Sequence, residues 1–554
     1  MDYEEALLAI TGAGQFFEIV DAKINGIEMK VFKNTPSCLG DLFANAAQHA
    51  NEIAVVYEDE RVSYETLMKR ADAFADLLAN HYGVQKGDRV AIAMRNLPEW
   101  IEAYIATLNI GAIATLINGW WQRDEIEYAL GDATPKVLIA DTERAKRSLA
   151  PASERGVPIV VVRSTPADDL GELRRFDPAT WETKPYKKPV MDPDDDATIL
   201  YTSGTTGFPK GALSTHRAIM NAVYANGARA QMSTLRYPPK QPSQWPTSFI
   251  LAVPLFHVTG CVSVLLSSLI TNSKLVLMHR WDPDVALAII EEEHITHFIG
   301  VPTMSWDMLE SPNFTKTDTS SLLSMGGGGS AVPPELIKRI ANGIKNGRPG
   351  FGYGMTETNS YGPQIGDDEA LQYPKSAGRS LPIVEIAILD PMGEKVPVGE
   401  RGEICFKGAT VIKEYWNKPE ANAKTFVDGF LRSGDIGHLD ENGLVYVDDR
   451  IKDMVIRGGE NVYCAEVESA IYEYPAVYEA AVFGLPHPRL GEEVAASIYL
   501  KEGSKVSPQE ISSFLSKKIA SYKIPTKLYI ESDPLPRGAT GKIQKRELRD
   551  RHVD

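Results

Sequence analysis

The sequence predicts an α/β protein with a large N-terminal domain of stacked parallel αβα sheets, a β-rich subdomain, and a small α+β C-terminal domain. Apolar β-rich runs alternate with helical patterns over roughly the first 300 residues. This alternation is typical of parallel sheets with helices on both faces. After about residue 380, short strands and turn signals follow each other closely, which predicts the β-rich part. The length of 554 residues corresponds to about three to four domain-sized units.

The first strands are predicted from short apolar runs. These runs are Val90–Met94, Val137–Ala140, Ile159–Val162, Leu275–Met278 and His297–Val301. A helix is predicted before them, because apolar residues recur at a spacing that places them on one helical face. Its apolar positions are Leu67, Ala71, Phe74 and Leu78.

The middle of the chain contains a neutral stretch, Thr247–Ile270, that is long enough to span a bilayer. It contains Pro254, His257 and Gly260 among several serines and threonines, so we expect a buried strand, turn and helix instead. The segment Arg229–Pro246 is rich in Pro, Gln and Ser and is predicted to be a loop.

The last third is predicted to contain two units. Short strands are expected at Glu385–Leu389, Glu403–Phe406 and Leu444–Val447. Residues 452–554 are long enough for a small domain with its own core, which divides the chain into domains 1–451 and 452–554. An amphipathic helix there is expected from Ile511, Phe514, Leu515 and Ile519.

Composition and charge narrow the function classes. The formal charge is 58 − 74 = −16, and an acidic surface argues against nucleic acid as the main partner. The four cysteines are far apart and form no CxxC pair, which favours a reducing compartment and predicts a cytoplasmic protein. The acidic start MDYEEALLAI lacks the basic flank and apolar core of a signal peptide.

The run Tyr201–Gly211 has the composition of a phosphate-binding loop. Its three glycines permit close backbone approach, its four hydroxyl residues can donate to phosphate oxygens, and Lys210 adds a positive charge. The apolar run Ala197–Leu200 before it predicts a strand. The spacing is not that of a mononucleotide P-loop, since Lys210 follows Gly207 by three residues. A polar hairpin turn is the alternative interpretation.

Six ordered motifs resemble those of the adenylate-forming enzymes, which comprise acyl-CoA synthetases, peptide-synthetase adenylation domains and firefly-type luciferases. The motifs are Tyr201–Gly211, Gly352–Glu357, Arg432–Asp435, Asp449–Asp453, Arg457–Val462 and Pro536–Ile543. The resemblance implies that the C-terminal domain is mobile, and that ATP, Mg²⁺ and coenzyme A are the cofactors and cosubstrates.

The resemblance also implies the nucleotide-binding residues. Tyr353 would stack on adenine. Asp435, which is expected in a tight turn after Gly434, would accept both ribose hydroxyls, and Arg450 would contact the same ribose or the phosphate. His257 would lie at the mouth of the acyl pocket, although a histidine in an apolar run is more often a packed residue. The remaining implied binding residues are Thr202, Ser203, Gly204, Thr205, Thr206, Gly207, Lys210, Gly328, Gly329, Ser330, Ala331, Gly352, Gly354, Met355 and Thr356.

Four residues are implied to be catalytic: Lys542, Thr356, Glu357 and Lys210. Lys542 would bridge the carboxylate substrate and the α-phosphate, because a cation placed between two anions stabilises their encounter. A lysine near the end of a chain is otherwise usually a solvated surface charge. Glu357 and Thr205 would hold Mg²⁺, which prefers oxygen ligands.

The implied second step is transfer of the acyl group to CoA after the C-terminal domain turns about Lys452. The turn would withdraw Lys542 and bring Gly458, Gly459 and Asn461 to the pantetheine tunnel. Three places depart from the common family pattern. They are Phe351, Cys464 in place of a frequent proline, and Asn118-Gly119-Trp120-Trp121.

The sequence therefore predicts an acyl-CoA synthetase. The segments expected to line its pocket, Phe256–Gly260, Ile299–Thr303 and Gly326–Ser330, are apolar or small, which favours a medium- or long-chain fatty acid or an aryl or branched acid. The alternatives are an acyl-AMP ligase that loads a carrier protein, a luciferase-like monooxygenase, and a non-catalytic nucleotide-binding protein. No transmembrane segment is expected, whereas peripheral membrane contact and a homodimer stay open.

Overall fold

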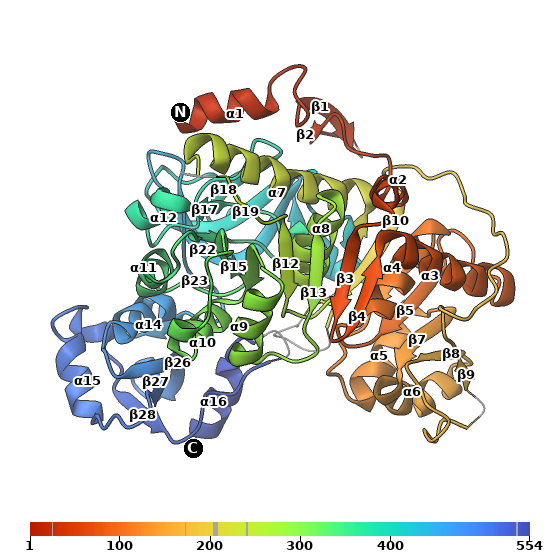
Figure 1. Cartoon of the computed structure of the whole chain (residues 1–554). Helices are drawn as coiled ribbons and strands as arrows, with labels where there is room; N and C mark the ends of the chain where they lie inside the picture. Colours follow the sequence, from red (N-terminus) through yellow and green to blue (C-terminus); the bar gives the residue numbers. More distant parts are fainter. Residues whose placement is uncertain (25, 172, 203–208, 240–241, 539–540, 554) are drawn as a thin grey trace.

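Two eight-stranded sheets form the framework of the large domain (Figure 1). The computed structural model describes residues 1–554 except 25, 172, 203–208, 240–241, 539–540 and 554. The first sheet has the order β20 (Glu414–Tyr415), β11 (Gly211–Thr215), β10 (Asp196–Tyr201), β6 (Ile113–Leu116), β5 (Arg89–Ala93), β7 (Val137–Asp141), β8 (Ile159–Val162) and β9 (Arg174–Arg175). The second has the order β17 (Gln364–Gly366), β16 (Arg348–Gly352), β15 (Ser324–Gly328), β14 (His297–Gly300), β12 (Ser248–Leu251), β13 (Lys274–Leu277), β3 (Ile53–Tyr57) and β4 (Glu60–Ser63).

The central strands of both sheets pair in parallel, whereas β11 pairs antiparallel with β10 and β20, and helices cover the first sheet on both faces. Val90 and Ile92 of β5 belong to the main core, which they share with α3 (Tyr64–Asp76) and α4 (Pro98–Asn109). Ala91 and Ala93 point to a second core. The helices over that second core are α5 (Arg123–Ala133) and α6 (Thr142–Glu154). Burial of both faces explains why these strands are continuous apolar runs.

The other helices of the large domain complete these layers, and the N-terminal helix packs on α7 (Figure 1). They are α1 (Tyr3–Thr11), α2 (Leu39–Ala46), α7 (His216–Arg236), α8 (Ser267–Ile270), α9 (Pro283–Glu292), α10 (Pro302–Glu310), α11 (Pro334–Gly343), α12 (Asp367–Gln372) and α13 (Pro419–Thr425). A hairpin of β1 (Ile19–Ile24) and β2 (Ile27–Phe32) follows α1.

Two smaller sheets build the rest of the chain. The β-rich subdomain contains β18 (Val384–Leu389), β19 (Gly402–Gly408), β21 (Phe426–Val427), β22 (Phe430–Leu439) and β23 (Val445–Arg450). The C-terminal sheet contains β24 (Val455–Arg457), β25 (Glu460–Val462), β26 (Val477–His487), β27 (Gly491–Leu500) and β28 (Lys527–Glu531). Helices α14 (Cys464–Tyr472), α15 (Pro508–Leu515) and α16 (Lys545–His552) accompany it. This part has its own apolar core, which begins at Val455.

The predicted fold class is confirmed, and three local predictions are wrong. The segment predicted as a loop from Arg229 is helical as far as Arg236, because α7 continues to that residue. Ile519 lies beyond the end of α15 at Leu515. Asp435 is part of strand β22 and not of a tight turn, although Gly434 before it does have a positive φ of 76°.

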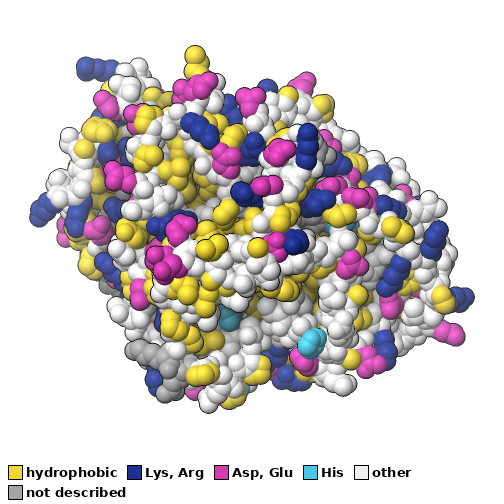
Figure 2. Space-filling model, turned by 90° about the horizontal axis from the view of Figure 1, so that it is seen from above, with side chains coloured by type: hydrophobic (Ala, Val, Ile, Leu, Met, Phe, Trp, Pro, Cys, Tyr) yellow, Lys and Arg dark blue, Asp and Glu magenta, His cyan; other side chains and the backbone are white. Residues whose placement is uncertain are grey.

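The neutral stretch Thr247–Ile270 contains strand β12, a turn, the π-helical segment η3 (Thr259–Leu266) and α8, as predicted. Among the helices of the described chain, none combines the length and apolarity that crossing a bilayer requires. On the face seen in Figure 2, basic and acidic side chains are interspersed.

Candidate active site

A cleft of about 3290 Å³ lies where the C-terminal domain meets the large domain, and it extends into the large domain. Most of the residues predicted for the site line it. They are Thr202, Lys210, His257, Gly328, Gly329, Ser330, Ala331, Gly352, Tyr353, Gly354, Met355, Thr356, Glu357, Asp435, Arg450, Lys452 and Lys542. Ser203, Gly204, Thr205, Thr206 and Gly207 lie outside the described residues.

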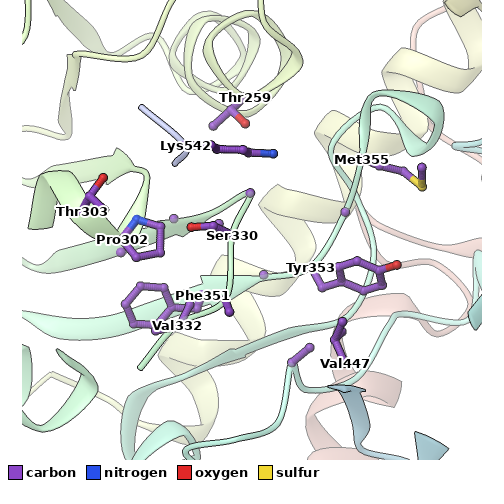
Figure 3. Close-up of a pocket in the computed structure, with 18 of the residues that line it drawn as sticks. Thr259, Pro302, Thr303, Ser330, Val332, Phe351, Tyr353, Met355, Val447 and Lys542 are labelled. Carbon is purple, nitrogen blue, oxygen red and sulfur yellow. The ribbon is translucent and has the colours of Figure 1, made fainter. Parts of the chain in front are cut away.

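Lys542 enters the cleft from the C-terminal domain. Figure 3 shows its side chain between Thr259 and Ser330. A β-carbon on Gly329 would lie 3.3 Å from Lys542 Cε, so the missing side chain makes room for the lysine. Burial, followed by the charge of Arg450, lowers the pKa of Lys542 to about 8, while Asp435 and Glu357 act in the opposite direction. The ammonium group of Lys542 is therefore largely enclosed by the walls of the cleft and is not a solvated surface charge.

Asp435 lies in a network of three side chains at one wall. The Tyr353 hydroxyl donates to Asp435 Oδ2 over 2.6 Å, and Arg450 Nε lies 3.4 Å from Asp435 Oδ1. Asp435 and Arg450 face each other because β22 and β23 pair antiparallel at this register. Burial raises the pKa of Asp435 above its ordinary value, against the opposing effect of Arg450. A ligand that donates two hydroxyl groups to Asp435 would displace the Tyr353 hydroxyl. It would also lower the free-energy cost of burying the charged Asp435 carboxylate.

Glu357 and Lys210 meet at Tyr415, a residue that the sequence analysis missed. The Tyr415 hydroxyl donates to Glu357 Oε1 over 2.6 Å, and Lys210 Nζ lies 3.9 Å from the centre of the Tyr415 ring. Burial lowers the pKa of Lys210, and the Glu357 charge raises it. No local motif marks Tyr415, because strand β20 brings it to the site from a distant part of the chain.

A main-chain hydrogen bond joins the described ends of the phosphate-loop motif. The Thr202 N–H donates to the carbonyl of Lys210 over 2.9 Å, so the two ends of the phosphate-loop motif lie side by side. Strands β10 and β11 lead into and out of this loop.

Glu357 fits a role as a Mg²⁺ ligand. It is 6% exposed, and only Oε1 is engaged by Tyr415, which leaves Oε2 for a cation. In the described part of the chain, no group of three His, Cys, Asp or Glu side chains could hold a metal ion. A single protein carboxylate suits Mg²⁺ bound together with nucleotide phosphates, since Mg²⁺ often takes one or two carboxylates and completes its shell with phosphate and water.

His257 lies on the opposite wall as an uncharged ring. Its Nδ1 accepts from the Thr259 N–H over 3.3 Å. Burial, followed by the positive charge of Lys542, lowers the pKa of His257 to about 3. The imidazole is therefore neutral at pH 7, and with Nδ1 as acceptor its proton lies on Nε2.

Glycines make the floor of the cleft. Strands β15 and β16 carry Gly326, Gly328, Gly350 and Gly352 at paired positions. A β-carbon on Gly326 or Gly328 would collide with the carbonyl of the paired glycine. Glycine is therefore required where these two strands lie beneath a ligand.

Gly458, Gly459 and Asn461 are not brought into the cleft in this arrangement. They form the exposed end of the β24–β25 hairpin, where Gly458 and Gly459 have φ values of +63° and +91°. Positive φ at both positions is the requirement of a tight hairpin turn, and glycine meets it without strain.

Asp449 and Cys464 join the two domains beside Lys452. The Asp449 carboxylate accepts from the Arg450 N–H over 2.8 Å and from the Cys464 N–H at the start of α14. The Cys464 thiol donates to the Asp453 carbonyl over 3.0 Å. Burial raises the pKa of Asp449 to about 6. A carboxylate at a helix N-terminus is favourably placed, and here it lies across the proposed domain boundary.

Comparison with known proteins identifies the class of the chain. The model of AMP-binding enzymes matches residues 42–416, and that of the AMP-binding enzyme C-terminal domain matches residues 466–542. Together with the cleft described above, these matches define an adenylate-forming enzyme.

Comparison with individual relatives narrows the class of this enzyme to a family. A long-chain-fatty-acid–CoA ligase of Mycobacterium tuberculosis is 34% identical over 89% of this chain and 94% of its own length. A feruloyl-CoA synthase of an Amycolatopsis species is 34% identical over 92% of this chain and 97% of its own. The solved structure of the o-succinylbenzoate CoA synthetase of Bacillus subtilis, with its acyl-adenylate intermediate, superposes with a TM-score of 0.77 at 31% identity, covering 92% and 98% of the two chains. The chain belongs to the acyl-CoA synthetase family and is an acid–thiol ligase that uses ATP and CoA.

Proposed function

We propose that this enzyme activates a hydrophobic carboxylic acid, either a medium- or long-chain fatty acid or an aryl or branched acid. Phe249, Phe256 and Ile299 line the inner part of the cleft. The arginines that line it are paired: Arg348 with Asp367 over 3.2 Å, and Arg236 with Glu369 over 3.1 Å. Neither of these two arginines is therefore a free cation that would select a second carboxylate, which supports an uncharged acyl group.

In the first step, a carboxylate oxygen attacks the α-phosphorus of ATP. The bond to the bridging oxygen breaks, and pyrophosphate leaves. Lys542 lies between the glycine floor and the wall that carries His257, where it pairs with both anions as they approach. Lys210 pairs with the negative charge of the departing phosphates. Glu357 would hold Mg²⁺, which would supply further charge neutralisation of the phosphate oxygens when bound.

In the second step, the CoA sulfur attacks the acyl carbon, the acyl–oxygen bond to AMP breaks, and the thiol proton is released to solvent. We propose that this step follows a rotation of domain 452–554 against domain 1–451 about Lys452. Lys542 occupies the cleft while the Gly458–Gly459 turn lies outside it, so the present arrangement suits adenylation only.

The position of Lys542 is the observation on which the proposal depends, since its ammonium group lies inside the cleft beside Gly329, where it can pair with a phosphate and a carboxylate. The four buried, unpaired cysteines support a reducing, cytoplasmic compartment. Peripheral membrane contact and a homodimer stay predictions.

The test is ATP–pyrophosphate exchange over a panel of carboxylic acids, followed by detection of the thioester with CoA. The expected result is exchange and thioester formation with the same acids. Exchange without thioester would contradict the CoA step and favour a carrier protein as acceptor. ATP binding without any pyrophosphate release would contradict catalysis altogether.

A further inference from the structure

The inner cavity beneath Lys542 is built from three rows of residues paired across neighbouring strands. The first row contains Gly328, Gly352 and Gln364, and the second contains Ile299, Gly326, Gly350 and Gly366. The third contains Phe249, His297, Ser324 and Arg348. All of them line the cavity. The third row lies four residues from the first, which is about 13 Å along a strand.

The glycines of the first two rows leave a flat slot between the sheet and helix α7. Val223, Asn226, Ala230 and Ser233 recur on one face of α7 and form the opposite wall. An acyl group that enters past Lys542 therefore meets little side-chain volume until the third row. The third row determines what the far end of the acid contacts.

Two polar side chains of the third row, His297 and Ser324, each have an atom without a hydrogen-bond partner among the described residues. His297 Nδ1 lies 2.8 Å from Thr296 Oγ1, whose own hydroxyl donates to the Ser248 carbonyl over 2.9 Å. Thr296 therefore accepts from Nδ1–H, and the neutral ring is left with a lone pair on Nε2. In the described chain, neither His297 Nε2 nor Ser324 Oγ makes a hydrogen bond.

The environment keeps His297 uncharged and fixed. Burial lowers the pKa of His297 to about 4, so the ring is neutral at pH 7. Its ring stacks on Phe249 with a centroid distance of 5.0 Å. Ser324 is its direct partner on β15, and a β-carbon on Gly350 would lie 3.6 Å from Ser324 Oγ, which places the hydroxyl over the glycine floor. The His297 acceptor and the Ser324 hydroxyl thus stand side by side at the end of the slot, next to Arg348, whose charge is paired with Asp367.

We infer that the acid carries a hydroxyl group at its far end, donated to His297 Nε2 and accepting from Ser324 Oγ. The inference rests on the proposed function and narrows its substrate class to hydroxylated aryl or alkyl acids. A polar pair that is desolvated without a partner costs free energy, so a plain hydrocarbon end binds less well than a hydroxyl of matching reach.

The experiment compares matched acids, para-hydroxycinnamic with cinnamic acid and a graded series of ω-hydroxyalkanoic with alkanoic acids, by kcat/KM for pyrophosphate release. The wild-type enzyme is expected to prefer the best hydroxylated acid over its unsubstituted match by about tenfold or more. His297→Phe and Ser324→Ala should each reduce this preference, because each removes one of the two hydrogen-bond partners proposed for the hydroxyl.

Ser263→Ala is the matched control. Ser263 Oγ also lines the cavity but already pairs with Ser360 Oγ over 2.7 Å, so its removal should leave the preference for the hydroxyl unchanged. Equal or better turnover of the unsubstituted acids by the wild type would overturn the inference while the proposed function stands. If no acid of either series releases pyrophosphate, both are wrong.

Discussion

At the scale of single residues, the chemistry depends on how much of its charge Lys542 retains inside the cleft. We expect Lys542→Ala to slow acyl-AMP formation by about 10²- to 10³-fold, because one charge-stabilising donor is lost from the transition state. Thioester formation from supplied acyl-AMP should be nearly unchanged. The measurement is the rate of each half-reaction, and an equal loss in both would argue against alternating domain positions.

The pKa of Lys542 also predicts a pH dependence. Because this pKa is about 8 in the free enzyme, the ammonium is present below that pH and is lost as the pH rises through it. The kcat/KM for ATP, which reports groups of the free enzyme, should therefore fall above about pH 8. Lys542→Arg, whose guanidinium stays charged, should have a lower rate but no such fall. The same fall in the arginine variant would assign it to another group.

Tyr415 gives a third prediction. Tyr415→Phe keeps the ring beside Lys210 but removes the donor to Glu357, so the carboxylate loses its fixed orientation. Loss of such an outer hydrogen bond typically weakens metal binding by about 10- to 100-fold. Activity measured against Mg²⁺ concentration should show this shift. An unchanged Mg²⁺ requirement would mean that Glu357 is not a ligand.

At the scale of secondary-structure elements, the N–H of Cys464 at the start of α14 donates to Asp449, which lies on the other side of the proposed domain boundary. Cys464→Pro removes the N–H that donates to Asp449. The helix itself should tolerate this change, because proline is accepted at a first helical position and the backbone of the preceding Tyr463 is already extended. A hydrogen bond to a charged group is worth about 1.5–3 kcal/mol, so adenylation should slow by about tenfold or more. Thioester formation from supplied acyl-AMP should not slow.

Cys464→Ala is the control for this variant, because it keeps the N–H and removes only the thiol. Adenylation in the alanine variant should stay close to the wild-type rate. A proline variant that slows both half-reactions alike has lost stability, and the contact across the boundary would then have no role in positioning Lys542.

Sequence patterns predicted the elements whose burial is local. Val90–Met94 and Ile159–Val162 are strands because a run buried on both faces must be apolar. The end of α7 was not predicted, because the prolines after Arg236 make the whole segment resemble a loop. In the structure the Arg236 guanidinium pairs with the Glu369 carboxylate. His297 and Tyr415 could not be found, since their importance comes from strand pairings and contacts with distant segments that no local pattern records.

At the scale of the whole molecule, Lys542 lines the cleft whereas the Gly458–Gly459 turn does not, and the proposed rotation would exchange the two. Spin labels at Met392→Cys and Asn461→Cys would report the two domains, because both positions are exposed and the four native cysteines are buried. A stable acyl-AMP analogue with CoA should produce a second distance population in double electron–electron resonance. A single distribution that is unchanged in every ligand state would contradict the rotation.

The wall of the acyl slot has a consequence for engineering. One helix, α7, supplies that wall through Val223, Asn226, Ala230 and Ser233, whereas the nucleotide is expected to contact loops and strand ends elsewhere. These α7 positions thus lie in a different stretch of chain from the motifs implied to bind the nucleotide. A combinatorial library confined to these helix positions should yield catalysts with altered acid scope while their use of ATP is retained.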